Sequence, residues 1–157
     1  MKPRIANPIA LAPEQVKAMM ALENSFAATG LDPVLLELVR LRVSQINHCA
    51  FCIHMHTGLL RKDGQSEMRL YMLDAWRESS LYTPRERAAL GWAEALTRLS
   101  ETHAPDADYE DFAFEFSEAE QVQLTFAIGA INTWNRVQVG FRAAHPVSAE
   151  DRARVAA

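Results

Sequence analysis

At the centre of the sequence lies the segment Glu37-Leu-Val-Arg-Leu-Arg-Val-Ser-Gln-Ile-Asn-His-Cys49-Ala-Phe-Cys52-Ile-His-Met-His56. It contains both cysteines of the chain, three of its five histidines and one carboxylate set in an apolar run. Two cysteines this close together, in a chain without a secretion signal, are more typical of redox or metal chemistry than of a structural disulfide. We therefore expect any chemistry of the protein to lie in this segment.

The residues before the cysteines predict a central helix. Asp32 is a suitable N-cap and Pro33 a suitable first helical residue. The helix that follows is apolar almost all round, which is typical of a helix buried on every side. Its apolar residues are Leu35, Leu36, Leu38, Val39, Leu41, Val43 and Ile46.

The cysteines begin a second helix, predicted from Cys49 to about Arg61, with Asn47 as its cap and Gly64 after its end. Spacings of three and four residues place Cys49, Cys52, His56 and Leu59 in one stripe, facing a sheltered pocket, and place His54 on the opposite, exposed face. Thiolate is favoured in the first turn of a helix, where unpaired N–H groups and the helix dipole stabilise negative charge. A thiolate attacks peroxide, and a second thiol can condense with the resulting sulfenic acid to a disulfide.

Glu37 is the unusual residue of the central helix, because a carboxylate is costly to bury unless it is paired. Its structural partner would be Arg40, three residues later, and its functional partner would be His56. With a pKa raised by its sheltered position, Glu37 could receive a proton relayed by His56. Both pairings remain open from the sequence.

The rest of the chain also predicts helices. One begins near Pro13, one at Ser66, and two begin with capping boxes at Thr83 and Ser117. We expect the last of these to bury Leu124, Phe126, Ile128, Ile131, Trp134, Val137 and Phe141. Residues 103–116 show little periodicity and predict a loop, and the last ten residues predict a frayed end. No segment alternates as a strand does, so the chain is predicted to be one all-α domain, residues 1–157, of about six helices.

Composition narrows the classes of function. The chain has 157 residues, 49% hydrophobic and 23% charged, with a formal net charge of −4. No basic cluster interleaved with aromatic residues suggests nucleic acid as a partner, and no run reaches the ~18 apolar residues of a membrane-spanning helix. The N-terminus lacks a signal-peptide pattern, so a cytoplasmic location is expected. The many apolar residues of the last helix predict a homo-oligomer.

Several motifs resemble those of the AhpD-like alkylhydroperoxidases of the carboxymuconolactone decarboxylase superfamily. The core motif, from Glu37 to His56, resembles the family in Glu37, the Cys49-x-x-Cys52 pair and His56, with Ser44 and Asn47 ahead of the cysteines. The similarity runs from about Leu31 to Pro146. It includes two further segments, Ala75-Trp-Arg-Glu78 followed by Thr83-Pro-Arg-Glu-Arg87, and Ala130-Ile-Asn-Thr-Trp-Asn-Arg136.

This resemblance implies an all-α fold that assembles into oligomers and reduces small or organic hydroperoxides, with a dithiol as reductant and no cofactor or metal. By position, Cys52 would attack the peroxide, Cys49 would resolve the sulfenic acid, and His56 would relay the proton to Glu37. The founding members carry a histidine just before the second cysteine, where this chain has Phe51. A smaller proton network is therefore expected.

Other functions remain open. The reaction that names the superfamily is a lactone decarboxylation, which has no use for two thiols. Cys49, Cys52 and His56 could instead bind zinc with His48 or Glu37, the protein could be a redox-sensing oligomer, or the thiols could be an inert buried pair. Asn132, Asn135 and Arg136 are expected to fix a helix end or an interface rather than to contact substrate.

Overall fold

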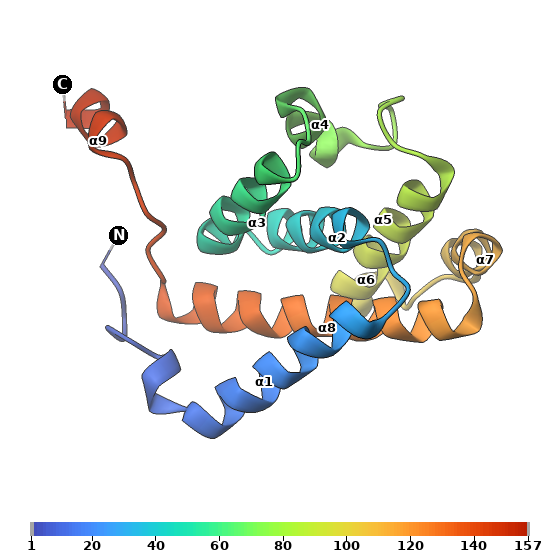
Figure 1. Ribbon diagram of the computed structural model, residues 1–157, viewed down its shortest axis with the longest axis horizontal. Helices are drawn as coiled ribbons and strands as arrows, with labels where there is room; N and C mark the ends of the chain where they lie inside the picture. The colour runs from blue at the N-terminus through green and yellow to red at the C-terminus, as the bar shows by residue number, and fades with distance from the viewer. Residues whose placement is uncertain (1, 157) are drawn as a thin grey trace.

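The computed structural model describes residues 2–156, which form α-helices and three short 3-10 helices without a β-strand in that range (Figure 1). The fold is all-α, as predicted, but with more helices than the six expected. The α-helices are α1 (Pro13–Ser25), α2 (Pro33–Ile46), α3 (Ala50–Lys62), α4 (Glu67–Met72), α5 (Pro84–Thr97), α6 (Leu99–Thr102), α7 (Asp106–Glu115), α8 (Glu118–Phe141) and α9 (Ala149–Ala156). The 3-10 helices are η1 (Ile9–Leu11), η2 (Phe26–Ala28) and η3 (Leu73–Ala75).

Helix α2 is the centre of the fold and packs against α3, α5 and α8. It begins as predicted, with Asp32 accepting a hydrogen bond from the backbone N–H of Val34 at 2.9 Å and with Pro33 in its first turn. Because three helices cover α2, little of its surface meets solvent, and this explains why its residues are apolar on nearly every side. Its buried apolar residues are Leu35, Leu36, Leu38, Val39, Leu41 and Val43.

Helix α8 is the longest helix and lies along one side of the molecule, where α1 crosses it (Figure 1). Its predicted capping box is present. Leu124, Ile128 and Ile131 are buried, but Phe126 is 59% exposed, so its predicted burial was wrong. Phe126 lies two residues from both Leu124 and Ile128, and that spacing turns it away from their face. The homo-oligomer that could cover such a surface stays a prediction.

Two predictions of irregular structure were also wrong. The predicted loop contains α7, which is held by Phe112, a fully buried ring that stacks on Trp92 at 5.3 Å between centroids. One large anchor with acidic residues in the first turn is enough for a helix here, although it produces no periodic pattern. At the C-terminus, residues predicted to fray form α9, which projects away from the packed helices (Figure 1).

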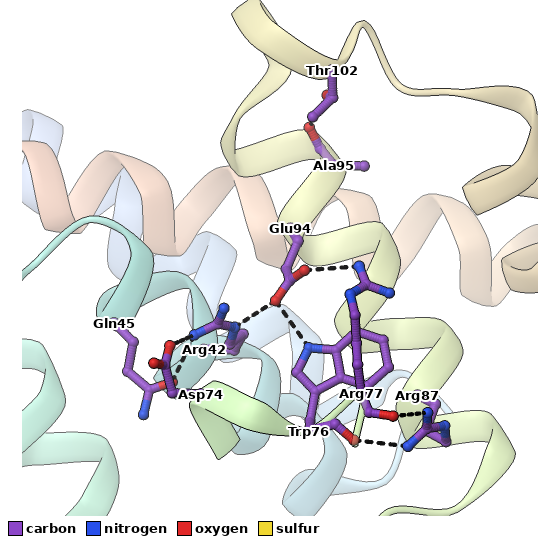
Figure 2. A network of polar contacts seen from close by, with 9 residues as sticks. All are labelled: Arg42, Gln45, Asp74, Trp76, Arg77, Arg87, Glu94, Ala95 and Thr102. Carbon is purple, nitrogen blue, oxygen red and sulfur yellow. Dashed lines mark hydrogen bonds and ion pairs between the residues drawn. The ribbon is translucent and has the colours of Figure 1, made fainter. Parts of the chain in front are cut away.

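A buried carboxylate, Glu94 of α5, joins α2 to the segment after α4 (Figure 2). One oxygen accepts from Arg42 Nε at 2.7 Å and from Trp76 Nε1 at 2.9 Å, and the other accepts from Arg77 at 2.8 Å. Arg42 also pairs with Asp74. Burial raises the pKa of Glu94, but the bonds and charges of these partners outweigh burial and leave the pKa below its ordinary value.

None of the described helices is both long enough and apolar enough to cross a membrane.

Candidate redox site

The two cysteines lie at the start of α3 and form a disulfide, with their Cα atoms 5.3 Å apart. Cys49 is the N-cap of the helix, and its sulfur accepts a hydrogen bond from the backbone N–H of Cys52 at 3.4 Å. The side chains are 1% and 2% exposed. The prediction that both sulfurs lie in the first turn is thus confirmed, and the contact with a backbone N–H is the interaction that favours a thiolate when the pair is reduced.

The turn before the cysteines is fixed by Asn47, although not in the way predicted. Because Cys49 is itself the cap of α3, Asn47 ends α2 instead, and its amide donates to Oδ1 of Asn132 and of Asn135, at 2.9 Å each. Asn135 in turn donates to Ser44 at 3.1 Å. The asparagines of α8 therefore fix the end of α2, as expected of them.

His56 lies one helical turn after Cys52 and is bonded to Glu37. The distance from His56 Nδ1 to Glu37 Oε2 is 2.7 Å, and the other oxygen of Glu37 accepts from Arg40 at 2.6 Å. His56 is buried, and the Glu37 side chain is 12% exposed. The two partners that the sequence left as alternatives for Glu37 are both present, one on each oxygen.

The predicted direction of the Glu37 pKa was wrong. Burial raises the pKa of this carboxyl, but the hydrogen bonds of His56 and Arg40, the positive charge of Arg40 and that of His56 when its ring is protonated together lower it below the ordinary value of 4.5. Glu37 is therefore ionised near neutral pH, and an ionised carboxylate only accepts hydrogen bonds. It follows that His56 Nδ1 carries a hydrogen and donates it, so Nε2 is the nitrogen that can take up a proton.

Two further residues, which the sequence did not suggest, extend this network. Arg40 also donates to Glu23 Oε2 at 2.7 Å, and the other oxygen of Glu23 accepts from Trp134 Nε1 at 3.1 Å. Glu23 is 17 residues from Arg40 and 111 from Trp134. No local pattern could have joined these positions, since three different helices supply them.

A cavity of about 400 Å³, here named the His56 cavity, opens beside these side chains. Cys52, His56, Glu37 and Arg40 line it, but Cys49 does not. Its apolar walls are formed by Ile9, Val16, Met20, Phe51, Met55, Leu59, Ile131 and Trp134.

His56 Nε2 is the notable atom of the site. It is buried and has no hydrogen-bond partner among the described residues, Cys52 included. A buried polar nitrogen without a partner is unfavourable and therefore uncommon. The sequence suggested that this imidazole could reach the thiol directly or through one water, and the disulfide form has no direct bond.

A metal site is not formed by these groups. Between residues 2 and 156, no three His, Cys, Asp or Glu side chains converge as a metal centre requires. His48 is exposed, and Glu37 is occupied by Arg40 and His56. The zinc hypothesis therefore has no support in the geometry.

Comparison with known proteins places this architecture in a family. The model of the carboxymuconolactone decarboxylase family matches residues 13–95. The uncharacterized protein YdfG of Bacillus subtilis is 41% identical over 136 residues, which are 85% of this chain and 92% of YdfG.

Solved structures agree. A protein of unknown function from Agrobacterium tumefaciens, suggested to be the antioxidant defence protein AhpD, has a TM-score of 0.89 and 50% identity, over 94% of this chain and 100% of that one. An uncharacterized peroxidase-related protein from Silicibacter sp. TM1040 has a TM-score of 0.76 and 25% identity, over 96% and 79% of the two chains. The family match covers more than half of the residues, and with these relatives it shows that the chain belongs to the carboxymuconolactone decarboxylase family and is AhpD-like.

Proposed function

We propose that the protein is a CxxC-dependent thiol peroxidase that reduces small or organic hydroperoxides. The observation that carries the proposal is that Cys52 and His56 line the same cavity, with His56 Nε2 unpartnered among the described residues, while Cys49 is near enough to form a disulfide with Cys52. The role suggested for the Agrobacterium relative, antioxidant defence, is of the same kind.

The reaction has two steps. In the first, the Cys52 thiolate attacks one oxygen of the hydroperoxide; the O–O bond breaks, Cys52 becomes a sulfenic acid, and the alcohol leaves with one proton. In the second, the Cys49 sulfur attacks the sulfenic acid, so that a disulfide forms and water leaves. Two electrons pass from the thiols to the peroxide, and an external dithiol restores the thiols.

His56 would act as the general base and then the general acid of the first step. Its Nε2 accepts the proton of the Cys52 thiol, directly or through a water, and returns it to the departing alkoxide. Glu37, ionised and bonded to Nδ1, is then a positioning residue rather than the final proton acceptor inferred from the family resemblance. It orients the ring and stabilises its positive charge.

Phe51 stands where the founding members of the family carry a histidine just before the second cysteine. Phe51 lines the His56 cavity and contributes no titratable group. We therefore expect the proton transfer to depend on His56 alone, which makes the activity sensitive to the Glu37–His56 pair.

The test is peroxide consumption by the wild type, Cys49→Ser and Cys52→Ser, with thiols counted before and after. The wild type is expected to lose two thiols per chain and to turn over with dithiothreitol. Cys49→Ser should react once, ending as a sulfenic acid, and Cys52→Ser should not react above the rate of a free thiol. Full turnover by Cys52→Ser would remove the basis of the proposal.

A further inference from the structure

The two cysteines of the disulfide line two different cavities. Cys52 lines the His56 cavity, and Cys49 lines a second cavity of about 420 Å³, here named the Cys49 cavity. Phe51 and Gln138 line both cavities and so form the wall between them. Neither cysteine lines the cavity of the other.

The outer wall of the Cys49 cavity is the segment that follows α8. Arg142 leaves the helix in a left-handed conformation, with φ 56°, and residues 143–147 then pass beside the start of α3. His145 of this segment stacks on His54 of α3, with 5.6 Å between ring centroids. The exposed His54 face of α3, opposite to its reactive stripe, is thus the support for this wall.

The charges of the two cavities differ. The described residues that line the Cys49 cavity include Arg142, His48 and His145 but no carboxylate. The His56 cavity includes Glu23 and Glu37, and Arg40 of the same cavity pairs with both. The Cys49 cavity therefore attracts an anionic thiolate, whereas the His56 cavity, with its carboxylates already paired, offers a thiolate from outside no such attraction. A neutral hydroperoxide carries no charge that either cavity would repel.

We propose that the two substrates enter by different routes: the hydroperoxide reaches Cys52 through the His56 cavity, and the dithiol reductant reaches Cys49 through the Cys49 cavity. This inference rests on the proposed function. A thiolate of the reductant attacks the Cys49 sulfur, the Cys49–Cys52 bond breaks, and Cys52 leaves as a thiolate. The second thiolate of the reductant then attacks its own sulfur in the mixed disulfide, which releases Cys49 as a thiolate and the reductant as a cyclic or intramolecular disulfide.

Attack on Cys49 expels Cys52 as a thiolate. Cys52 lies in the first turn of α3 and lines the same cavity as His56, so the helix N-terminus and a protonated His56 stabilise the leaving thiolate. A thiolate that attacked Cys52 would instead enter a cavity that already holds two carboxylates paired with Arg40. Each half of the cycle is thereby assigned to one sulfur and one cavity.

A pair of blocking variants tests the two routes separately. Val139→Trp fills the Cys49 cavity and Met20→Trp fills the His56 cavity; the two side chains are 45% and 47% exposed, so both positions admit a larger residue. Val122→Trp, on α8, 57% exposed and lining neither cavity, is the matched control. The two half-reactions are measured apart, as thiol loss with cumene hydroperoxide and as thiol recovery with dithiothreitol.

Val139→Trp is expected to slow recovery about tenfold and to leave thiol loss unchanged, because thiol–disulfide exchange depends on access to the attacked sulfur. Met20→Trp is expected to do the reverse, and Val122→Trp to change neither rate. If the physiological reductant is a protein with a CxxC dithiol, Val139→Trp is expected to slow thiol recovery with that reduced protein as it does with dithiothreitol. Equal slowing of both half-reactions by either blocking variant would overturn the proposal.

A second measurement needs no variant. The wild type is oxidised with diamide, treated briefly with 2-mercaptoethanol and quenched with N-ethylmaleimide, and the peptide is sequenced by mass spectrometry. The proposal expects mercaptoethanol on Cys49 and maleimide on Cys52; the opposite assignment would overturn it. Since diamide replaces the peroxide, this result is independent of whether the protein reduces hydroperoxides.

Discussion

Glu94, which is buried, and Glu37, which is mostly buried, are two carboxylates with similar ion pairs, but they differ in what their partners contact. Each pairs with an arginine of α2, and for each the pKa lies below its ordinary value although burial raises it. The partners of Glu94 are two arginines and an indole N–H, and Glu94 lines none of the cavities described above (Figure 2). Glu37 pairs with Arg40 and His56; His56 lines a cavity, and its second nitrogen is buried without a partner among the described residues.

The comparison shows that burial, an ion pair and a lowered pKa do not by themselves indicate chemistry. Glu94 has all three, and its geometry serves to join α2, α5 and the segment around Trp76. What distinguishes Glu37 is its neighbour His56, which lines a cavity and has a ring nitrogen without a partner among the described residues. If this difference matters, substitutions of Glu94 should lower the stability of the fold, and substitutions of Glu37 should lower peroxide turnover.

The largest effect is expected from Glu94→Ala. It leaves the Arg42 side chain, 7% exposed, without its buried carboxylate. Breaking such a pair destabilises a protein by about 3 kcal/mol, at the lower end of the usual range because Asp74 still pairs with Arg42. Urea unfolding measures the loss, and Glu94→Gln, which keeps an acceptor, should lose less. If peroxide turnover per folded molecule fell instead, Glu94 would belong with Glu37.

Glu37→Gln should have the next largest effect, on turnover rather than on stability. Without the negative charge, the protonated ring of His56 is less stable, so fewer Cys52 thiols ionise and the rate near pH 7 falls by about 10²-fold. The rate should recover as the pH is raised, since hydroxide then ionises the thiol without His56. A pH profile of peroxide consumption checks this. A uniform loss at every pH would indicate a structural role only.

Acid should affect the two carboxylates alike. Because the folded-state pKa of each is lowered, each contributes stability that is fully present above the unfolded value of 4.5 and is lost as the pH falls through the folded value. Glu37→Gln and Glu94→Gln should each reduce the steepness of this loss, by at most about 1.4 kcal/mol per pH unit. Unfolding free energies measured below pH 4.5 would show it. Variants as steep as the wild type would contradict the pKa direction.

The smallest effect is expected from Trp134→Phe, which removes the hydrogen bond to Glu23 at the outer end of the Glu37 network. A single hydrogen bond contributes about 1 kcal/mol to stability, and peroxide turnover should fall only a few-fold. Trp92→Phe is the control, because it also removes a hydrogen bond from an indole N–H, here to the hydroxyl of Thr125, outside the His56 cavity. Equal turnover in both variants would place Trp134 outside the functional network.

Much of the fold and of the site could be predicted because it depends on neighbours in sequence. The caps at Asp32, Ser66, Thr83 and Ser117, the buried circumference of α2 and the stripe from Cys49 to His56 all follow from spacings of three or four residues. Such short-range patterns are the part of a structure that a single sequence records best.

The remaining features depend on contacts between distant segments. Helix α7 is held because Phe112 stacks on Trp92. The pKa of Glu37 is lowered because Arg40 bonds one of its oxygens and His56 the other. The sequence suggested each partner but not their simultaneous presence, and it gave no sign of Glu23. The prediction that Asn47 caps α3 was wrong for the same reason, because the hydrogen-bond partners of its side chain lie on α8.

The Asn47 contacts have a consequence for the evolution of this site. One side chain at the turn before the cysteines satisfies two amides on α8 that are 85 and 88 residues away. Loss of Asn47 removes a donor from both asparagine oxygens, although Asn132 and Asn135 keep their bonds to Thr97 and Ser44, so homologous sequences that lose Asn47 should also change at position 132 or 135. In an alignment of homologous sequences, position 47 should therefore covary with positions 132 and 135 but not with position 133, which is Thr133 in this chain.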